Sequence, residues 1–101
     1  MPNPNYRAGV RWEREVKKRY EKEGWVVTRC AGSHGPYDLA ASKPDESLIR
    51  FIQCKRCDTI PVARKVIANL KKHPFLPPGI HYLRRIEVYV ASTRETIGAF
   101  L

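Results

Sequence analysis

Apolar positions spaced for helices and strands divide the chain into seven predicted elements. Residues 6–23 are rich in helix formers and lack proline, so they predict a helix with Asn5 as its N-cap and Gly24 as its C-terminal stop. Three β-branched or alternating runs, separated by turn-forming stretches, predict strands at 25–30, 37–41 and 48–55. These strands should form a meander behind the helix.

The second half of the chain predicts one more helix and two more strands. Pro61 suits the first turn of a helix that should end before Pro74, because apolar residues recur at helical spacing between them. The alternating run 86–91 predicts a strand, and 96–100 should pair back onto it. The order αβββαββ indicates an α/β fold of restriction-endonuclease type, a mixed sheet flanked by helices. With 101 residues, the chain should form a single domain, 1–101.

Charge adds a partner to this picture. Lys and Arg outnumber Asp and Glu by 19 to 10, which gives a net charge of +9. Such an excess favours a nucleic-acid partner, because basic side chains displace the counterions condensed on the polyanion, although a solvated basic surface would carry the same charge. A membrane partner is not expected, since the chain has neither an apolar run of spanning length nor a basic helix with Trp, Phe and Leu along its opposite face. Three cysteines without an export signal indicate reduced thiols and a cytoplasmic protein.

Glu13 stands where a carboxylate is costly. On the first predicted helix it falls within an apolar stripe that includes Val10, Val16 and Tyr20. An unpaired buried carboxylate would cost several kcal/mol, so Glu13 must meet a cation, a hydrogen-bond network or a metal ion. A salt bridge to an arginine or lysine of the sheet would satisfy it equally well.

Three further residues complete a recognisable order. Asp38 begins a predicted strand directly after a glycine-bearing loop, although it could simply cap a turn. Gln53 and Lys55 share one face of the next strand, although a lone lysine there is usually solvated. Helix Glu, strand Asp and a polar-x-Lys pair are what phosphodiester hydrolysis by a metal-dependent nuclease requires, since oxygen ligands must hold the ion beside the phosphate with a cation near the attacking water.

The blocks NYRAGVRWERE, RCAGSHGPYDL and FIQCK resemble the three motif blocks of archaeal-type Holliday junction resolvases, which belong to the PD-(D/E)xK nuclease superfamily. The resemblance implies cleavage of four-way DNA junctions with Mg²⁺, for which Mn²⁺ should substitute. It makes Glu13 and Asp38 metal ligands, with Gln53 in the position of a third, and Lys55 the catalytic lysine. Ser33 becomes a residue of the active-site loop.

The same resemblance implies a DNA-binding surface and a dimer. Arg14 and Arg29 fall where the family places basic residues near the DNA, and Arg7 and Arg11 border Arg14 on the first helix. His34 could contact a phosphate, although an exposed loop histidine is the simpler interpretation. Because resolving a junction needs two cuts related by a two-fold axis, we expect a symmetric homodimer.

Gln53 departs from the family pattern, which has Glu two residues before the lysine. Its amide oxygen can ligate a hard cation but brings no charge, so the affinity for metal should fall. Gln53 is then a natural variant of an active enzyme, a substitution introduced to block cleavage, or the mark of an inactive or altered site. Two alternative functions stay open: a related nuclease that cuts flaps or duplex DNA, and a junction-binding protein without catalysis.

Overall fold

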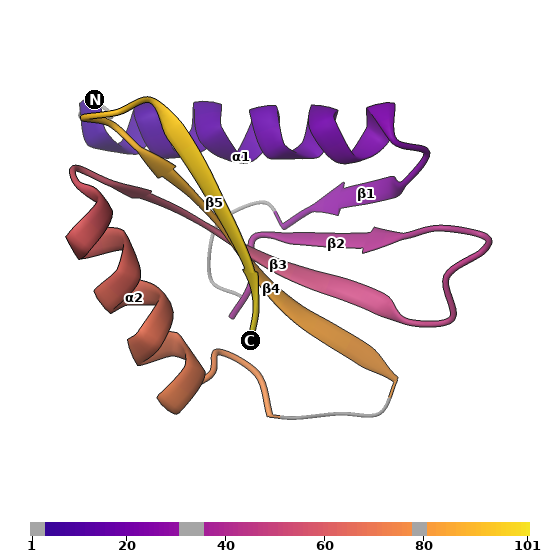
Figure 1. The fold of residues 1–101 in the computed structure, drawn as a ribbon. Helices are drawn as coiled ribbons and strands as arrows, with labels where there is room; N and C mark the ends of the chain where they lie inside the picture. The colour runs from indigo at the N-terminus through magenta and orange to yellow at the C-terminus, as the bar shows by residue number, and fades with distance from the viewer. Residues whose placement is uncertain (1–3, 31–35, 78–80) are drawn as a thin grey trace.

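A computed structural model describes residues 4–30, 36–77 and 81–101 of the chain (Figure 1). The order of elements is αβββαββ, as the sequence predicts. The helices and strands are α1 (Pro4–Lys22), β1 (Val26–Arg29), β2 (Leu39–Ser42), β3 (Ile49–Cys57), α2 (Ile60–Lys72), β4 (Tyr82–Val90) and β5 (Glu95–Phe100). No helix within these ranges is long and apolar enough to cross a membrane.

The five strands form one mixed sheet in the order β1-β2-β3-β4-β5. The first three strands are antiparallel, β3 and β4 are parallel and joined through α2, and β5 returns antiparallel to β4. The two helices pack on opposite faces of the sheet, and both contact the central strands β3 and β4 (Figure 1). The predicted α/β class, a mixed sheet flanked by helices, is therefore confirmed.

Helix α1 packs through a face centred on Trp12, Val16 and Tyr20, which are all buried. The predicted apolar stripe left out Trp12, so its centre was rotated away from the face that the helix buries. The Trp12 indole Nε1 donates to the Glu87 carbonyl oxygen at 3.0 Å. The predicted N-cap was also wrong, since the helix already begins at Pro4 and Asn5 lies inside it. Gly24 ends the helix as predicted, with a positive φ of 96° that glycine adopts without strain.

Helix α2 covers the other face. The Thr59 side chain caps its first turn by accepting from the Val62 amide at 3.4 Å, and Ala63 packs against the buried β4 residues Ile86 and Val88. Strand β4 begins at Tyr82 instead of residue 86, so the prediction was four residues short. The hydrophobic pattern missed this start because Arg84 interrupts it.

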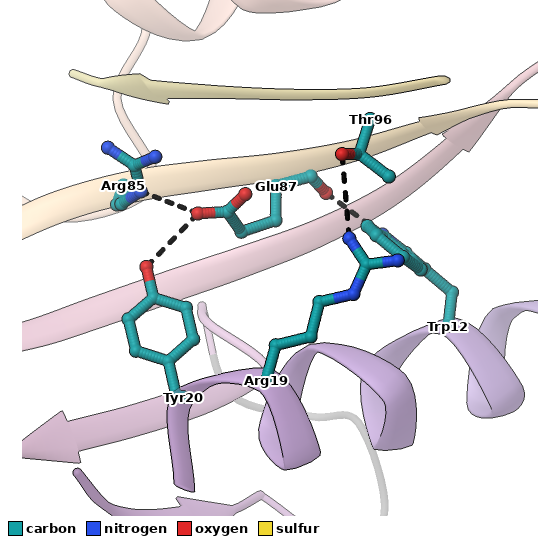
Figure 2. Close-up of polar contacts among 6 residues, drawn as sticks. All are labelled: Trp12, Arg19, Tyr20, Arg85, Glu87 and Thr96. Carbon is teal, nitrogen blue, oxygen red and sulfur yellow. Dashed lines mark hydrogen bonds and ion pairs between the residues drawn. The ribbon is translucent and has the colours of Figure 1, made fainter. Parts of the chain in front are cut away.

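A polar cluster joins α1 to β4 (Figure 2). The Glu87 carboxylate accepts from the Tyr20 hydroxyl at 3.0 Å and pairs with the Arg85 guanidinium at 2.5 Å, both through Oε1. Burial and the nearby Glu87 charge raise the pKa of Tyr20 to about 12, so its hydroxyl stays a donor at neutral pH. A side chain at Gly98 on β5 would meet Arg85 and approach Glu87 Oε2 to 2.8 Å, so glycine there leaves space for the cluster.

Candidate active site

Asp38 lies where β2 separates from β3. Its backbone amide donates to the Ile52 carbonyl at 3.0 Å, which is the last main-chain bond between the two strands at this end. The next β3 amide that faces β2, that of Cys54, donates to Asp38 Oδ2 at 2.8 Å instead of to a carbonyl. This bond to Oδ2 fixes the position of the Asp38 carboxylate.

Glu13 reaches the same place from α1. Its Oε2 pairs with Arg29 Nε of β1 at 3.0 Å, and the two side chains are 15% and 27% exposed. The salt bridge to the sheet, weighed above as an alternative to a metal site, is therefore present. Arg29 stands directly opposite Leu39 in the sheet, so the pair lies beside the start of β2 and next to Asp38.

Glu13 and Asp38 form a pair of interacting carboxyl groups. Burial raises the pKa of Glu13, and the adjacent Asp38 raises it further through charge repulsion and a hydrogen bond, while Arg29 lowers it. The two acids also act on Cys54, since burial raises the pKa of this thiol first and the charges of Asp38 and Glu13 raise it further. Two neighbouring carboxylates repel each other, and a cation bound between them would relieve this repulsion.

The register between β2 and β3 also determines where Gln53 lies. Leu39 pairs with Ile52, so continuing the antiparallel ladder by one residue brings Asp38 opposite Gln53. The Gln53 side chain lies on the α2 face with its neighbour Ile86. Its Oε1 is buried and has no hydrogen-bond partner among the described residues. A buried acceptor without a donor costs about 1–3 kcal/mol, so this oxygen is suited to a ligand that the structure does not contain.

The oxygens of Glu13, Asp38 and Gln53 fit a hard divalent cation. Mg²⁺ and Mn²⁺ prefer oxygen ligands, and all three side chains supply them. Within the described ranges no group of three His, Cys, Asp or Glu side chains could hold a metal, and only two of Glu13, Asp38 and Gln53 are acids. The donor set therefore carries two negative charges, one of which Arg29 already neutralises.

Lys55 lies on the Gln53 face of β3, two residues further along. Its side chain is exposed and borders a groove of about 440 Å³ between β3 and α2, together with Val62 and Val66. In the described part of the chain its ammonium group forms no salt bridge, so it is available to a phosphate or a water molecule. Glu13 lies on the α1 face of the sheet, whereas Gln53 and Lys55 lie on the α2 face. Side chains from the two faces can therefore meet only at the strand end where β2 separates from β3.

The predicted DNA-binding residues separate into two groups. Arg29 lies within the site and is held by Glu13, whereas Arg7, Arg11 and Arg14 are exposed on α1. Arg11 lies over β4, on the flank of α1 that faces away from Glu13 and β1. The predictions for Ser33 and His34 fall outside the described residues.

Sequence reasoning missed two features of this region. Arg29 was placed near the DNA, and its pairing with Glu13 was not recognised because the two residues belong to different elements. Arg56, which directly follows Lys55, was not singled out, although strand alternation puts it on the face opposite Lys55. This alternation was the signal in the sequence that could have identified Arg56.

Cys54 and Cys57 lie in different hydrophobic clusters, one under each helix.

Comparison with known proteins places this site in a family. The family model for the archaeal Holliday junction resolvase (Hjc) matches residues 4–74, a range that holds Glu13, Asp38, Gln53 and Lys55. The crossover junction endodeoxyribonuclease Hjc of Methanocaldococcus jannaschii is 50% identical over 50 residues, which are 50% of this chain and 35% of that protein. The chain thus matches about a third of the length of this curated relative.

A solved structure supports the same assignment at the level of the fold. Hjc of Archaeoglobus fulgidus, a Holliday junction resolvase, superposes with a TM-score of 0.57 at 15% identity. The match covers 93% of this chain and 71% of that protein. At this identity the likeness concerns the fold, whereas the family model covers the sequence of the site itself. The chain therefore belongs to the archaeal Holliday junction resolvase family.

Proposed function

We propose that this chain is a divalent-metal-dependent endodeoxyribonuclease that cuts four-way DNA junctions, with Glu13, Asp38 and Gln53 as metal ligands and Lys55 beside the reacting phosphate. The observation that carries the proposal is the meeting of the Glu13 and Asp38 carboxyls at the strand end opposite Gln53, whose oxygen is buried without a donor. The net charge of +9 and membership of the resolvase family support DNA as the substrate. We expect it to act in the cytoplasm.

The residues around the phosphate have different roles in the proposed reaction. A divalent cation, Mg²⁺ or Mn²⁺, would supply positive charge beside the scissile phosphodiester. Asp38, fixed by the Cys54 amide, orients its free oxygen toward the ligand position. Lys55 donates a hydrogen bond to the attacking water or to a phosphate oxygen, which stabilises the charge that develops in the transition state. Arg29, once it leaves Glu13, contacts the DNA backbone.

Two cuts in a junction require two sites, so we propose a symmetric homodimer. The face of α2 and the C-terminal strands are the candidate interface, and Val62, 45% exposed on α2, is one apolar residue available to it. Light scattering at the concentration used for cleavage should give the mass of a dimer. A monomeric mass there would count against this part of the proposal.

The deciding experiment compares the chain with its Gln53→Glu variant in Mg²⁺ and in Mn²⁺. Both proteins receive a synthetic four-way junction and a linear duplex made of the same arms. Cleavage of the junction in preference to the duplex, faster in the Gln53→Glu variant, supports the proposal. Equal cutting of both substrates would leave a nuclease of broader specificity, acting on flaps or duplex.

A second candidate function is junction binding without catalysis. The observation that favours it is Gln53, which removes one negative charge from the donor set. Tight binding of the junction with no metal-dependent nicking, unrestored by Gln53→Glu, would establish this alternative. Asp38→Asn then has no activity to remove and should leave binding intact.

A further inference from the structure

A groove of about 340 Å³ runs along the flank of α1 that faces β4, away from the candidate active site. We call it the α1–β4 groove, and its lining residues are Ala8, Arg11, Trp12, Glu15, Arg56 and Tyr89. It contains none of the residues assigned above to metal or to the reacting phosphate. Of its members only Arg11 was predicted to bind DNA, and Arg56 also lines the groove that Lys55 borders.

The groove and the active site lie on opposite flanks of one helix. Arg11 and Glu13 are two residues apart, which turns their side chains about 200° from each other on an α-helix. Glu13 accordingly meets β1, whereas Arg11 lies over the ends of β3 and β4. Since β1 and β4 are three strands apart in the sheet, their separation is about 14 Å.

Unmatched positive charge distinguishes the groove. The Arg11 and Arg56 side chains are exposed, and neither forms a salt bridge with a described residue. The acid of the groove, Glu15, is occupied by Arg19 at 3.3 Å. The groove therefore presents two free guanidinium groups to solvent, which is the chemistry that recognises phosphate.

Aromatic rings hold one of these guanidinium groups in place. Arg56 lies over the Tyr89 ring at 5.9 Å, and Tyr89 packs against Trp12 with ring centroids 5.5 Å apart. Trp12 is itself fixed by its hydrogen bond to β4 (Figure 2). Arg56 is thus presented from a rigid support, which lowers the entropy lost when it binds an anion.

We propose that the α1–β4 groove binds the phosphodiester backbone of DNA remote from the cut, so that the substrate contacts α1 on both flanks. The inference rests on the proposed function for DNA as the substrate. A branched DNA can place one arm at Glu13 and Asp38 and another arm across α1 in the groove.

The test measures equilibrium binding of a four-way junction and of a linear duplex at several salt concentrations, with Ca²⁺ to prevent cleavage. Arg56→Gln and Arg11→Gln should each weaken junction binding about fivefold to tenfold and reduce the salt dependence by about one counterion. Arg56→Lys should retain most of the affinity, because it keeps the charge. The matched control is Lys71→Gln at the end of α2, which removes one exposed charge elsewhere and should change affinity less than twofold.

The outcomes separate the groove from the proposed function. If Arg56→Gln and Arg11→Gln behave like Lys71→Gln while retaining the melting temperature of the parent, the groove is not a DNA contact and the inference fails. If the parent binds junction and duplex equally and Arg56→Gln weakens both, the groove stands and junction selectivity is what fails. If the groove variants lose affinity for an acidic protein and none for DNA, the groove serves a protein partner and the inference is overturned.

Discussion

Two glutamates at the interface between α1 and the sheet invite comparison. The side chains of Glu13 and Glu87 are both 15% exposed, and each pairs with one arginine of the sheet. Glu87 accepts from Arg85 and from the Tyr20 hydroxyl, so its charge is balanced by donors that belong to the fold (Figure 2). Glu13 has Arg29 on one side and a second carboxyl, Asp38, on the other.

The difference lies in the neighbours and not in the burial. Glu87 is surrounded by donors, as expected of a carboxylate that links two elements. Glu13 is placed beside another acid, which costs energy in the isolated protein because like charges repel. Such an arrangement is typical of sites that bind a cation, and exposure alone would not distinguish the proposed metal ligand Glu13 from Glu87, which links two elements.

The largest effect that this comparison predicts is at Asp38. Asp38→Asn keeps a side-chain oxygen for the Cys54 amide but removes the second negative charge from the site. Junction cleavage at saturating Mg²⁺ should fall about 100-fold or more, as is typical when one preorganised electrostatic group is lost. Gel-based cleavage assays measure this, and binding to the junction should change little. Asp45→Asn, in the exposed turn before β3, is the matched control and should cleave normally.

The next prediction compares how much Glu87 and Glu13 each contribute to the free energy of unfolding. Glu87→Gln leaves the Arg85 guanidinium half-buried without its counter-charge and should lower the free energy of unfolding by about 2 kcal/mol, the range for a buried pair reduced for partial exposure. Glu13→Gln relieves repulsion from Asp38 and should cost less than about 1 kcal/mol. Urea denaturation of the two isosteric variants measures both. A larger loss from Glu13→Gln would reverse the roles assigned here.

These two acids also show what the sequence could and could not predict. Glu13 was found because it interrupts an apolar stripe and fits a motif, and the αβββαββ order followed from periodicity. Glu87 was missed, since in IEVYV it merely continues the alternation of a strand, and only the packing of α1 covers that face. The pairing of Arg29 with Glu13 depends on the register of β1, which no local pattern fixes.

A smaller effect concerns Arg29 and the metal. Its guanidinium neutralises one of the two carboxylates that we propose as metal ligands, so Arg29 and the metal would compete for Glu13. Arg29→Gln should therefore raise the affinity for Mn²⁺ about tenfold at pH 7.5 in the absence of DNA, a change of about 1.4 kcal/mol. Calorimetric titration with Mn²⁺ measures it, with Arg19→Gln on the far flank of α1 as the control. Unchanged or weaker Mn²⁺ binding would mean that Arg29 supports the site and does not compete with the ion.

The smallest predicted effect is a shift in the pH at which Glu13 takes up its proton. Because burial and Asp38 raise the pKa of Glu13, this carboxyl should take up its proton at a higher pH than exposed glutamates do, and the metal site should be lost at correspondingly mild acidity. Arg29 acts in the opposite direction, so Arg29→Gln should move the midpoint to still higher pH. Carboxyl-carbon NMR of the metal-free protein measures both midpoints, with the glutamate of a short unfolded peptide as the reference. If Glu13 titrates together with the peptide glutamate in both proteins, Asp38 does not act on it, and the contrast with Glu87 reduces to two ordinary salt bridges.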